Sequence, residues 1–175
     1  MKPTTITLLA VASLAQGLVV PRDQKTVTDV LTGVQTGIDN LDTAVKSCCS
    51  NLGGLLDASN KLIAAITGGT STVSSSTPLT LIEAIKIIKP VQAVEAHAKT
   101  LVSDIKGQKA QIVQAGLCGV FAQQIETING DSQQLVKTTV GKVPQIAQSV
   151  ATKVAQGILD VLADAKDAFS AANCK

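Results

Sequence analysis

His97 is the only histidine of the chain, so acid–base chemistry in this protein would depend on one imidazole. It lies between the apolar positions Val94 and Leu101, where it could act as a general base or as a pH switch. A histidine at the edge of an apolar stripe is the simpler interpretation, and we favour it. The sequence has no Gly-x-Ser-x-Gly nucleophile elbow, and its acidic residues are scattered singly. We therefore predict that the protein is not an enzyme and has no catalytic residues.

The composition argues against a metal site, a cofactor site and a nucleic-acid site. A single histidine excludes a metal site built from several histidines, and residues 116–119 (GLCG) lack the Gly-Lys-Ser/Thr ending of a phosphate-binding loop. The net charge is +2, and the only aromatic residues are Phe121 and Phe169. Proteins that bind nucleic acids usually combine basic patches with aromatic residues on which bases stack. We expect no metal, no cofactor and no nucleic-acid partner.

The first residues have the features of a secretory signal. A basic start is followed by an apolar run over 6–15, and small residues at Ala15 and Gly17 suit cleavage after Gly17. We expect 1–17 to be a signal peptide, 18–24 to be a short pro-segment cut after Arg22 or a disordered N-terminus, and 25–175 to form one domain. No stretch is long and apolar enough to predict a transmembrane helix.

Apolar residues recur at helical spacing along the rest of the chain. From Val27 to Leu52 they are spaced alternately by four and three residues, as on one face of a helix. Gly53-Gly54 predicts a break or a kink in the first helix, and Gly68-Gly69 predicts the end of a shorter second helix. The Ser/Thr-rich run 70–78 predicts a loop. A third helix begins at Leu79, is kinked at Pro90 and ends near Gly116, and two further helices follow from Leu117 and Pro144. We predict an all-α, up-and-down bundle of about five amphipathic helices.

Four cysteines in a secreted chain suggest two disulfides, with three possible connectivities. The up-and-down order places all of them at one end of the bundle: Cys48, Cys49, Cys118 and Cys174. A bridge between the adjacent Cys48 and Cys49 would be strained. We therefore expect each of these two cysteines to pair with one of the other two.

The helices carry enough apolar surface to hold an apolar ligand. Residues 79–88 are apolar on nearly every face, so this segment is either deeply buried or lines an apolar space. Periodicity alone does not distinguish a packed core from a cavity. If a fatty acid lies along the bundle axis, we expect it to contact eight side chains: Ile85, Ile88, Leu101, Ile105, Phe121, Ile125, Val154 and Ile158.

Six short stretches, spread over the chain after the signal, have a recognisable pattern: 26–31 (TVTDVL), 38–46 (IDNLDTAVK), 56–63 (LDASNKLI), 90–92 (PVQ), 109–117 (KAQIVQAGL) and 142–144 (KVP). With these stretches the chain resembles the fungal hydrophobic surface-binding protein A family, also known as cell wall galactomannoproteins. Cysteines are not part of the family pattern. Their presence here raises the question of whether this bundle opens as freely as its relatives.

The resemblance implies a secreted, cell-wall-associated helical protein that binds hydrophobic matter. One hypothesis is a monomeric carrier that holds a long-chain fatty acid between its helices. The alternative is an adhesion protein with a dry core, which coats apolar surfaces or recruits hydrolases to them, with cell-wall polysaccharide as a further partner. Family resemblance brings no catalytic residues with it.

Overall fold

The computed structural model describes residues 22–47 and 51–175, and the first helix shows why the chain folds as it does. α1 (Arg22–Val45) places its apolar stripe on one face, and every member of that stripe is buried: Val27, Leu31, Val34, Ile38, Leu41 and Val45. A helix with one apolar face is stable only when other helices cover that face.

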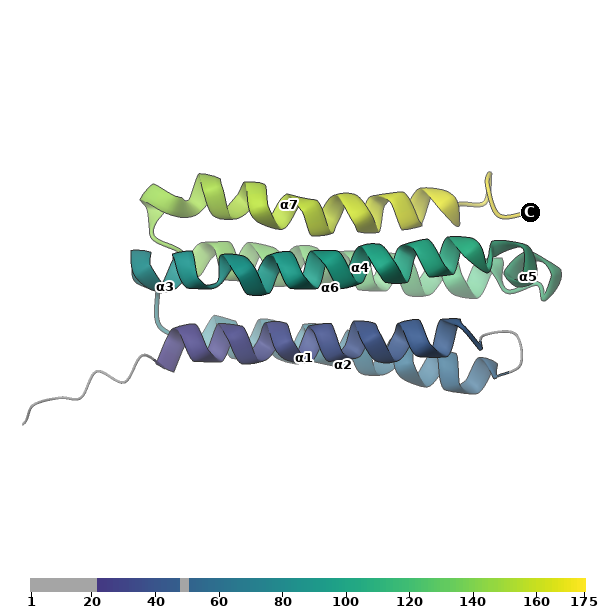
Figure 1. Cartoon of the computed structure of the whole chain (residues 1–175), viewed down its shortest axis with the longest axis horizontal. Coiled ribbons are helices and arrows are strands. Elements are labelled where there is room, and N and C mark those ends of the chain that lie inside the picture. The colour runs from purple at the N-terminus through teal and green to yellow at the C-terminus, as the bar shows by residue number, and fades with distance from the viewer. Residues whose placement is uncertain (1–21, 48–50) are drawn as a thin grey trace, which may run out of the picture.

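Four further long helices provide this cover, and two short helices lie next to one of them (Figure 1). The elements after α1 are α2 (Leu52–Ser75), α3 (Leu81–Lys86), α4 (Ile88–Gly107), α5 (Lys109–Gln114), α6 (Cys118–Lys142) and α7 (Gln145–Ala168). The chain reverses direction between successive long helices, and the described residues contain no strand. The all-α, up-and-down prediction is confirmed.

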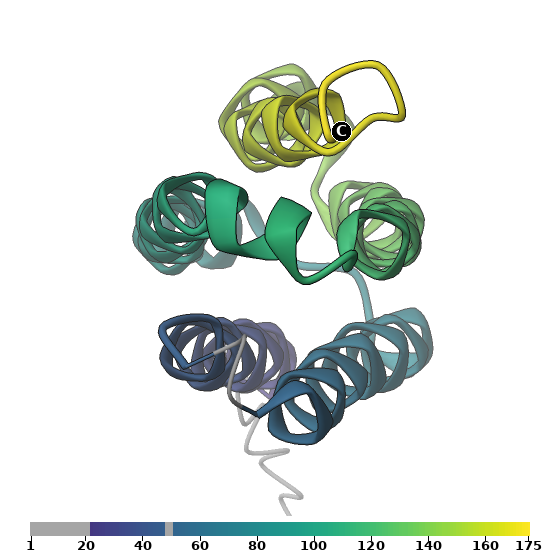
Figure 2. The same ribbon diagram turned by 90° about the vertical axis from the view of Figure 1, so that its right-hand side faces the viewer.

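The five long helices form a closed ring. α1 packs on α2 and α4, α2 packs on α6, and α7 completes the ring by packing on both α4 and α6. Viewed along the axis, α1 and α2 form one layer, α4 and α6 a second, and α7 a third (Figure 2). A ring of five helices surrounds a wider space than four helices do, and side chains must fill it.

Local capping residues explain where several helices begin and end. Asn51 caps α2 by accepting a hydrogen bond from the Gly54 amide at 3.0 Å, and Thr80 and Glu83 form a reciprocal capping box at the start of α3. After α5, Gly116 has a φ of +70°, and the Leu117 amide donates to the Ile112 carbonyl. This is the glycine-dependent end that a Schellman motif requires.

Some expected boundaries were wrong. Gly53-Gly54 lies in the first turn of α2 instead of breaking or kinking the first helix, and α2 continues through Gly68-Gly69 and the expected loop as far as Ser75. Gly69 is tolerated because it lies against α1, where an added Cβ would be 2.5 Å from Val30 Cγ1. The break near Pro90 falls at Ile87, so the proline lies in the first turn of α4, where a missing amide proton costs little.

The expected disulfide pairing was also wrong. Cys118 is bonded to Cys174, with their Cα atoms 5.8 Å apart. The packing explains this pairing, because the chain after α7 lies beside the start of α6, the helix on which α7 packs. Cys48 and Cys49 lie outside the described residues.

The described chain begins inside the segment 18–24. Residues 22–24 form the first turn of α1, so they are not disordered, and the pro-segment stays a prediction. The predicted signal peptide lies outside the described residues. No helix in the described part of the chain is long and apolar enough to cross a membrane.

Candidate functional site

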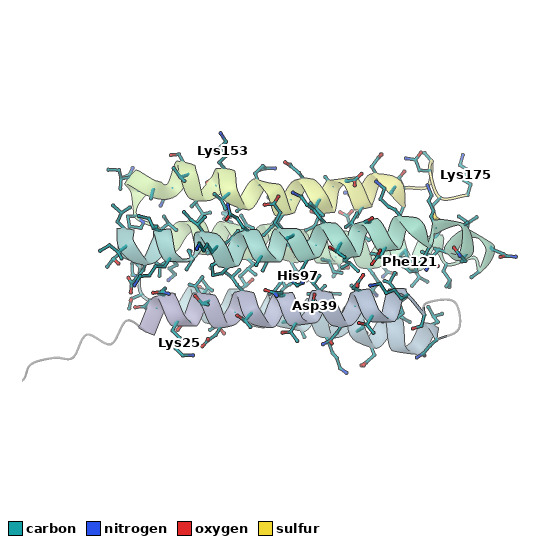
Figure 3. The ribbon with its side chains drawn as sticks, in the orientation of Figure 1. Lys25, Asp39, His97, Phe121, Lys153 and Lys175 are labelled. Carbon is teal, nitrogen blue, oxygen red and sulfur yellow. A yellow bond between two sulfur atoms is a disulfide. The ribbon has the colours of Figure 1, made fainter. Side chains whose placement is uncertain are left out.

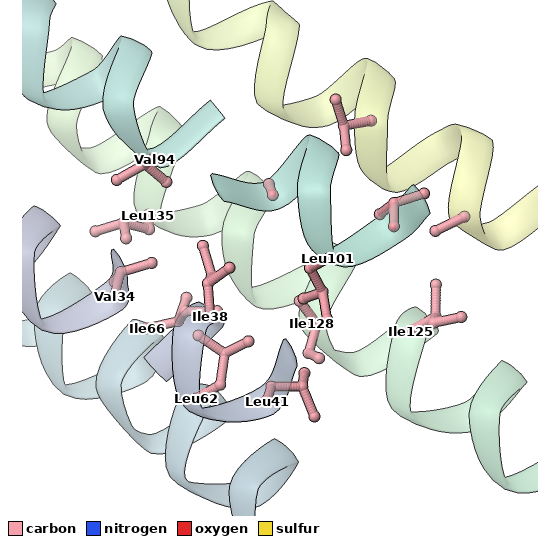
Figure 4. Packing of buried hydrophobic residues seen from close by; sticks show 14 of the residues in the cluster. Val34, Ile38, Leu41, Leu62, Ile66, Val94, Leu101, Ile125, Ile128 and Leu135 are labelled. Atoms are coloured by element: carbon pink, nitrogen blue, oxygen red, sulfur yellow. The ribbon is translucent and has the colours of Figure 1, made fainter. Parts of the chain in front are cut away.

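The centre of the helix ring contains an apolar cavity of about 80 Å³. All five long helices line it, through residues such as Ile38 of α1, Leu62 of α2, Leu101 of α4, Ile125 of α6 and Ile158 of α7. Figure 4 shows several of these side chains pointing from separate helices into a common interior. This cavity, cavity 1, extends toward the disulfide end of the bundle, where Phe121 and Ala165 line it.

A second cavity, cavity 2, lies toward the other end of the bundle and also has a volume of about 80 Å³. Its lining includes Ala84 of α3, Ile88 of α4, Val143 after α6 and Ala151 of α7. The two cavities are neighbours along the axis, and five residues line both of them: Val34, Ile66, Val94, Ser132 and Ile158. Together they give the ring an apolar interior that runs along its axis.

Seven of the eight side chains predicted to contact a ligand line these cavities. Cavity 1 includes Leu101, Ile105, Phe121, Ile125 and Ile158, and cavity 2 includes Ile88, Val154 and again Ile158. Ile85 does not belong with them, because it is 58% exposed. It lies on α3, a two-turn helix at the end of the ring that is packed on one side only, through Ala84 and the following Ile87. This exposure contradicts deep burial of the whole segment 79–88, whereas the other alternative holds for Ala84, Ile87 and Ile88, which line cavity 2.

Sequence reasoning missed the polar residues in the cavity wall. Ser59 is only 3% exposed, and its hydroxyl donates to Gln124 Oε1 at 2.8 Å, which joins α2 to α6. Both residues line cavity 1, and Ser132 lines both cavities. A buried hydroxyl such as that of Ser59 is costly unless it is hydrogen-bonded, and the half-buried Gln124 provides the partner. The pair offers a hydroxyl and an amide to a ligand. Ser59 and Gln124 occupy positions of the apolar stripes of α2 and α6, and this spacing could have predicted that both side chains face the interior.

His97 joins two helices at the surface. Its Nδ1 lies 2.5 Å from Asp39 Oδ1, and its Nε2 lies 3.1 Å from Gln35 Nε2, with both partners on α1 (Figure 3). The geometry fits an imidazole that donates from Nδ1 to the carboxylate and accepts from the amide at Nε2. Both ring nitrogens are thus engaged in holding α4 against α1. Within 22–47 and 51–175, no cluster of His, Cys, Asp and Glu side chains is placed to hold a metal ion.

α7 is held most firmly at its C-terminal end. The Cys118–Cys174 disulfide lies there, and Phe169 at the end of α7 stacks on Phe121 with ring centroids 5.5 Å apart. Ion pairs join the second half of α7 to α4 and α6, between Lys106 and Asp164 at 3.0 Å and between Lys166 and Glu126 at 2.7 Å. The first half presents small side chains such as Ala151 and Ala155 to the interior.

Fold and site together define an all-helical bundle with an apolar interior. The chain belongs to the hydrophobic surface binding protein A family, whose profile matches residues 24–141. It is 28% identical over 162 residues to cell wall mannoprotein 1 of Aspergillus flavus and 26% identical over 169 residues to that of Aspergillus fumigatus. These matches cover 92% and 94% of this chain but only 59% and 58% of the two relatives.

Solved structures share the same fold. Ligand binding domain 1 of the Penicillium marneffei MP1 protein, complexed with arachidonic acids, superposes with a TM-score of 0.79 at 19% identity, covering 85% of this chain and 99% of that domain. The structure of AFMP4P in complex with palmitic acid superposes with a TM-score of 0.77 at 16% identity, covering 84% of this chain and 99% of that one.

Proposed function

We propose that this protein is a secreted, cell-wall-associated, non-enzymatic carrier of long-chain fatty acids, which it binds as a monomer between its helices. The observation that carries the proposal is the pair of neighbouring apolar cavities along the axis of the ring. Two further observations support it: the curated relatives are named cell wall mannoproteins, and similar domains bind arachidonic or palmitic acid.

The cavities are lined almost entirely by apolar side chains, so an alkyl chain inside them is removed from water. Burial of the chain gains roughly 0.8 kcal/mol per methylene. The ion pairs and the disulfide hold α7 along its second half, so its first half is the part of the ring that we expect to separate when a chain enters.

Native mass spectrometry of the secreted protein, with parallel lipid extraction, tests the proposal. We expect one or two fatty acids per chain, either co-purified or taken up during incubation with palmitic or arachidonic acid. Ile125→Trp places a large ring in cavity 1 and should abolish uptake, at a cost in stability of about 1–3 kcal/mol from overpacking. Gln111→Trp, at an exposed position of α5, is the matched control and should bind normally. A protein that stays free of lipid after incubation would contradict the proposal.

Surface adhesion is the second candidate, favoured by the exposed aliphatic side chains of α3. In this case the protein would coat apolar surfaces, or bring hydrolases or wall polysaccharide to them, and its core would stay dry. If adhesion requires the helices to separate, the Cys118–Cys174 bridge should limit it. Reduction should then increase adsorption to hydrophobic beads, and equal adsorption of the reduced and oxidised forms would exclude opening as the mechanism.

A further inference from the structure

Exposed aliphatic side chains gather at the end of the bundle opposite the disulfide. In the described part of the chain five large aliphatic side chains are exposed, and all of them belong to α3 or to the first two turns of α7. We call them the α3/α7 face: Leu81, Ile82, Ile85, Ile146 and Val150. α3 and α7 are in contact, and α3 lies at the same end of the bundle as the beginning of α7 (Figure 1).

The side chains of the α3/α7 face point away from the core. Leu81 and Ile85 are one helical turn apart, as are Ile146 and Val150, so each helix directs a stripe of side chains outward. The opposite side of α3 packs inward through Ala84, and Ile87 follows it into the core. Ile146 is 83% exposed and Ile82 is 67% exposed. A monomer exposes such a group of large aliphatic residues chiefly where it meets a partner.

The surrounding charge is positive. Three exposed lysines lie on the same elements as this face or directly beside them: Lys86 on α3, Lys89 in the first turn of α4, and Lys153 on α7 one turn after Val150. A fourth, Lys142, donates to the carbonyls of Ser74 and Ser76 and is engaged there. The Glu83 carboxylate is engaged in the capping box with Thr80. Asp23, at the nearby start of α1, accepts hydrogen bonds from Thr77. Lys153 points away from the bundle on α7 (Figure 3). An apolar patch bordered by lysines complements a surface with an apolar interior and anionic headgroups.

The same helices form the wall of cavity 2. Ala84 of α3 and Ala151 of α7 line that cavity, while Ile85 and Val150, the adjacent residues, belong to the α3/α7 face. The disulfide and the α7 ion pairs lie toward the other end of the bundle. Separation of α3 from the start of α7 would therefore open cavity 2 toward whatever covers this face.

We propose that the α3/α7 face docks onto an anionic lipid bilayer, and that a fatty acid passes from the bilayer into cavity 2 between α3 and α7. The docking step is argued only from the α3/α7 face and the lysines beside it, and does not depend on fatty-acid binding. The transfer step rests on the proposed fatty-acid binding.

Co-sedimentation with vesicles tests docking. The full secreted chain is mixed with vesicles of phosphatidylcholine alone or of phosphatidylcholine with phosphatidylserine. We expect binding to the anionic vesicles that weakens as salt is added. The variant Ile82→Asp/Ile146→Asp should bind at least about tenfold more weakly, because two aliphatic side chains become charged. The control Ala110→Asp/Ala171→Asp makes the same charge change at exposed positions near the disulfide end and should bind like the parent.

Three results would overturn the docking proposal. The first is equal binding by both double variants, and the second is equal binding to neutral and anionic vesicles. The third is adsorption to hydrophobic beads without binding to any vesicle, which would identify a solid apolar surface as the partner. Because all four substituted residues are exposed, unchanged thermal unfolding by circular dichroism should show that the variants are folded.

Transfer is tested separately from ligand binding. Uptake of palmitic acid added as monomer should be the same in the parent and in Ile82→Asp/Ile146→Asp, whereas uptake from anionic vesicles should be slower in the variant. Equal uptake from vesicles would overturn the transfer step. If the parent takes up no monomeric palmitic acid, the proposed function fails, and the co-sedimentation result still decides the docking proposal.

Discussion

Phe121 and Phe169, the two aromatic residues of the chain, stack on each other with ring centroids 5.5 Å apart and an interplanar angle of 22°. Phe121 lies in the first turn of α6, and Phe169 caps the end of α7. Each phenylalanine is close in sequence to one cysteine of the Cys118–Cys174 bridge. The disulfide and the aromatic contact therefore hold the start of α6 and the end of α7 together. Separation of the helices should therefore begin at the opposite end.

Phe169→Ala should strongly destabilise the protein. Phe169 is only 1% exposed, and truncation of a buried phenylalanine costs about 3–5 kcal/mol. The free energy of unfolding is best measured by urea denaturation with far-UV circular dichroism, because the chain has no tryptophan or tyrosine. Phe169→Leu should lose less, since it keeps most of the apolar volume. A loss below about 1 kcal/mol for the alanine variant would show that the pair is not tightly packed.

Gln124→Leu tests whether the polar pair in cavity 1 binds the carboxyl group of a fatty acid. If it does, affinity for palmitic acid should fall by about tenfold or more, the value of a lost hydrogen bond to a charged group. Binding of methyl palmitate, which cannot ionise, should change less. Gln123→Leu is the matched control, because the neighbouring glutamine is exposed. Equal loss in both variants, or no loss in Gln124→Leu, would contradict a role for this pair.

The sequence was sufficient to predict the all-helical bundle and most of the apolar residues in its interior. The stripe from Val27 to Val45 is buried as its spacing indicates, and the long helices follow the expected up-and-down order. Periodicity identifies the inward face of a helix wherever neighbours cover it on that face. It fails for α3, because this short helix lies at the end of the ring and exposes Leu81, Ile82 and Ile85.

Other features depend on which helices become neighbours. The Cys118–Cys174 pairing follows from the packing of α7 on α6, and the Ser59–Gln124 hydrogen bond follows from the packing of α2 on α6. Neither neighbour relationship can be derived from the spacing within a single helix. The same reasoning applies to Gly69. A glycine there predicts the end of a helix, but in the structure it lies within α2 and provides room for Val30 of α1.

The adjacent glycines of α2 give a matched pair of substitutions. Gly69→Ala should destabilise the protein by about 1–3 kcal/mol, because the new methyl group would overlap Val30 and force α1 and α2 apart. Gly68→Ala should stabilise it by up to about 1 kcal/mol, since nothing lies within 4 Å of the added Cβ and alanine favours the helix. Urea denaturation of both variants measures the difference. If both are stabilised, the close contact between α1 and α2 at Gly69 is absent in solution.

Asp23 should contribute to a loss of stability in acid. The Thr77 hydroxyl donates to its carboxylate, and the Thr77 amide donates to Oδ1 at 2.9 Å. These two bonds, with a smaller contribution from Lys142, lower the pKa of Asp23 below its ordinary value. Because the folded-state pKa is the lower one, the stabilisation is complete above the unfolded-state pKa of about 3.9. It is lost as the pH falls through the folded-state pKa.

Thermal unfolding from neutral pH down to about pH 2 measures this contribution, over a range that includes the ordinary aspartate pKa. The melting temperature of the parent should fall steeply below about pH 4. Asp23→Asn should melt at a lower temperature at neutral pH, because a neutral amide accepts hydrogen bonds more weakly than a carboxylate.

The melting temperature of Asp23→Asn should fall less steeply in acid than that of the parent, but it should still fall. The reason is that hydrogen bonds from Thr80 lower the pKa of Glu83, and Lys46 lowers the pKa of Asp104. The control Asp29→Asn removes an exposed carboxylate of the same helix that pairs with Lys25 and not with Thr77, so it separates the loss of one negative charge from the loss of the Thr77 contacts. Identical slopes for the parent and Asp23→Asn would show that the Thr77 contacts do not hold the start of α1 to the segment after α2 in solution.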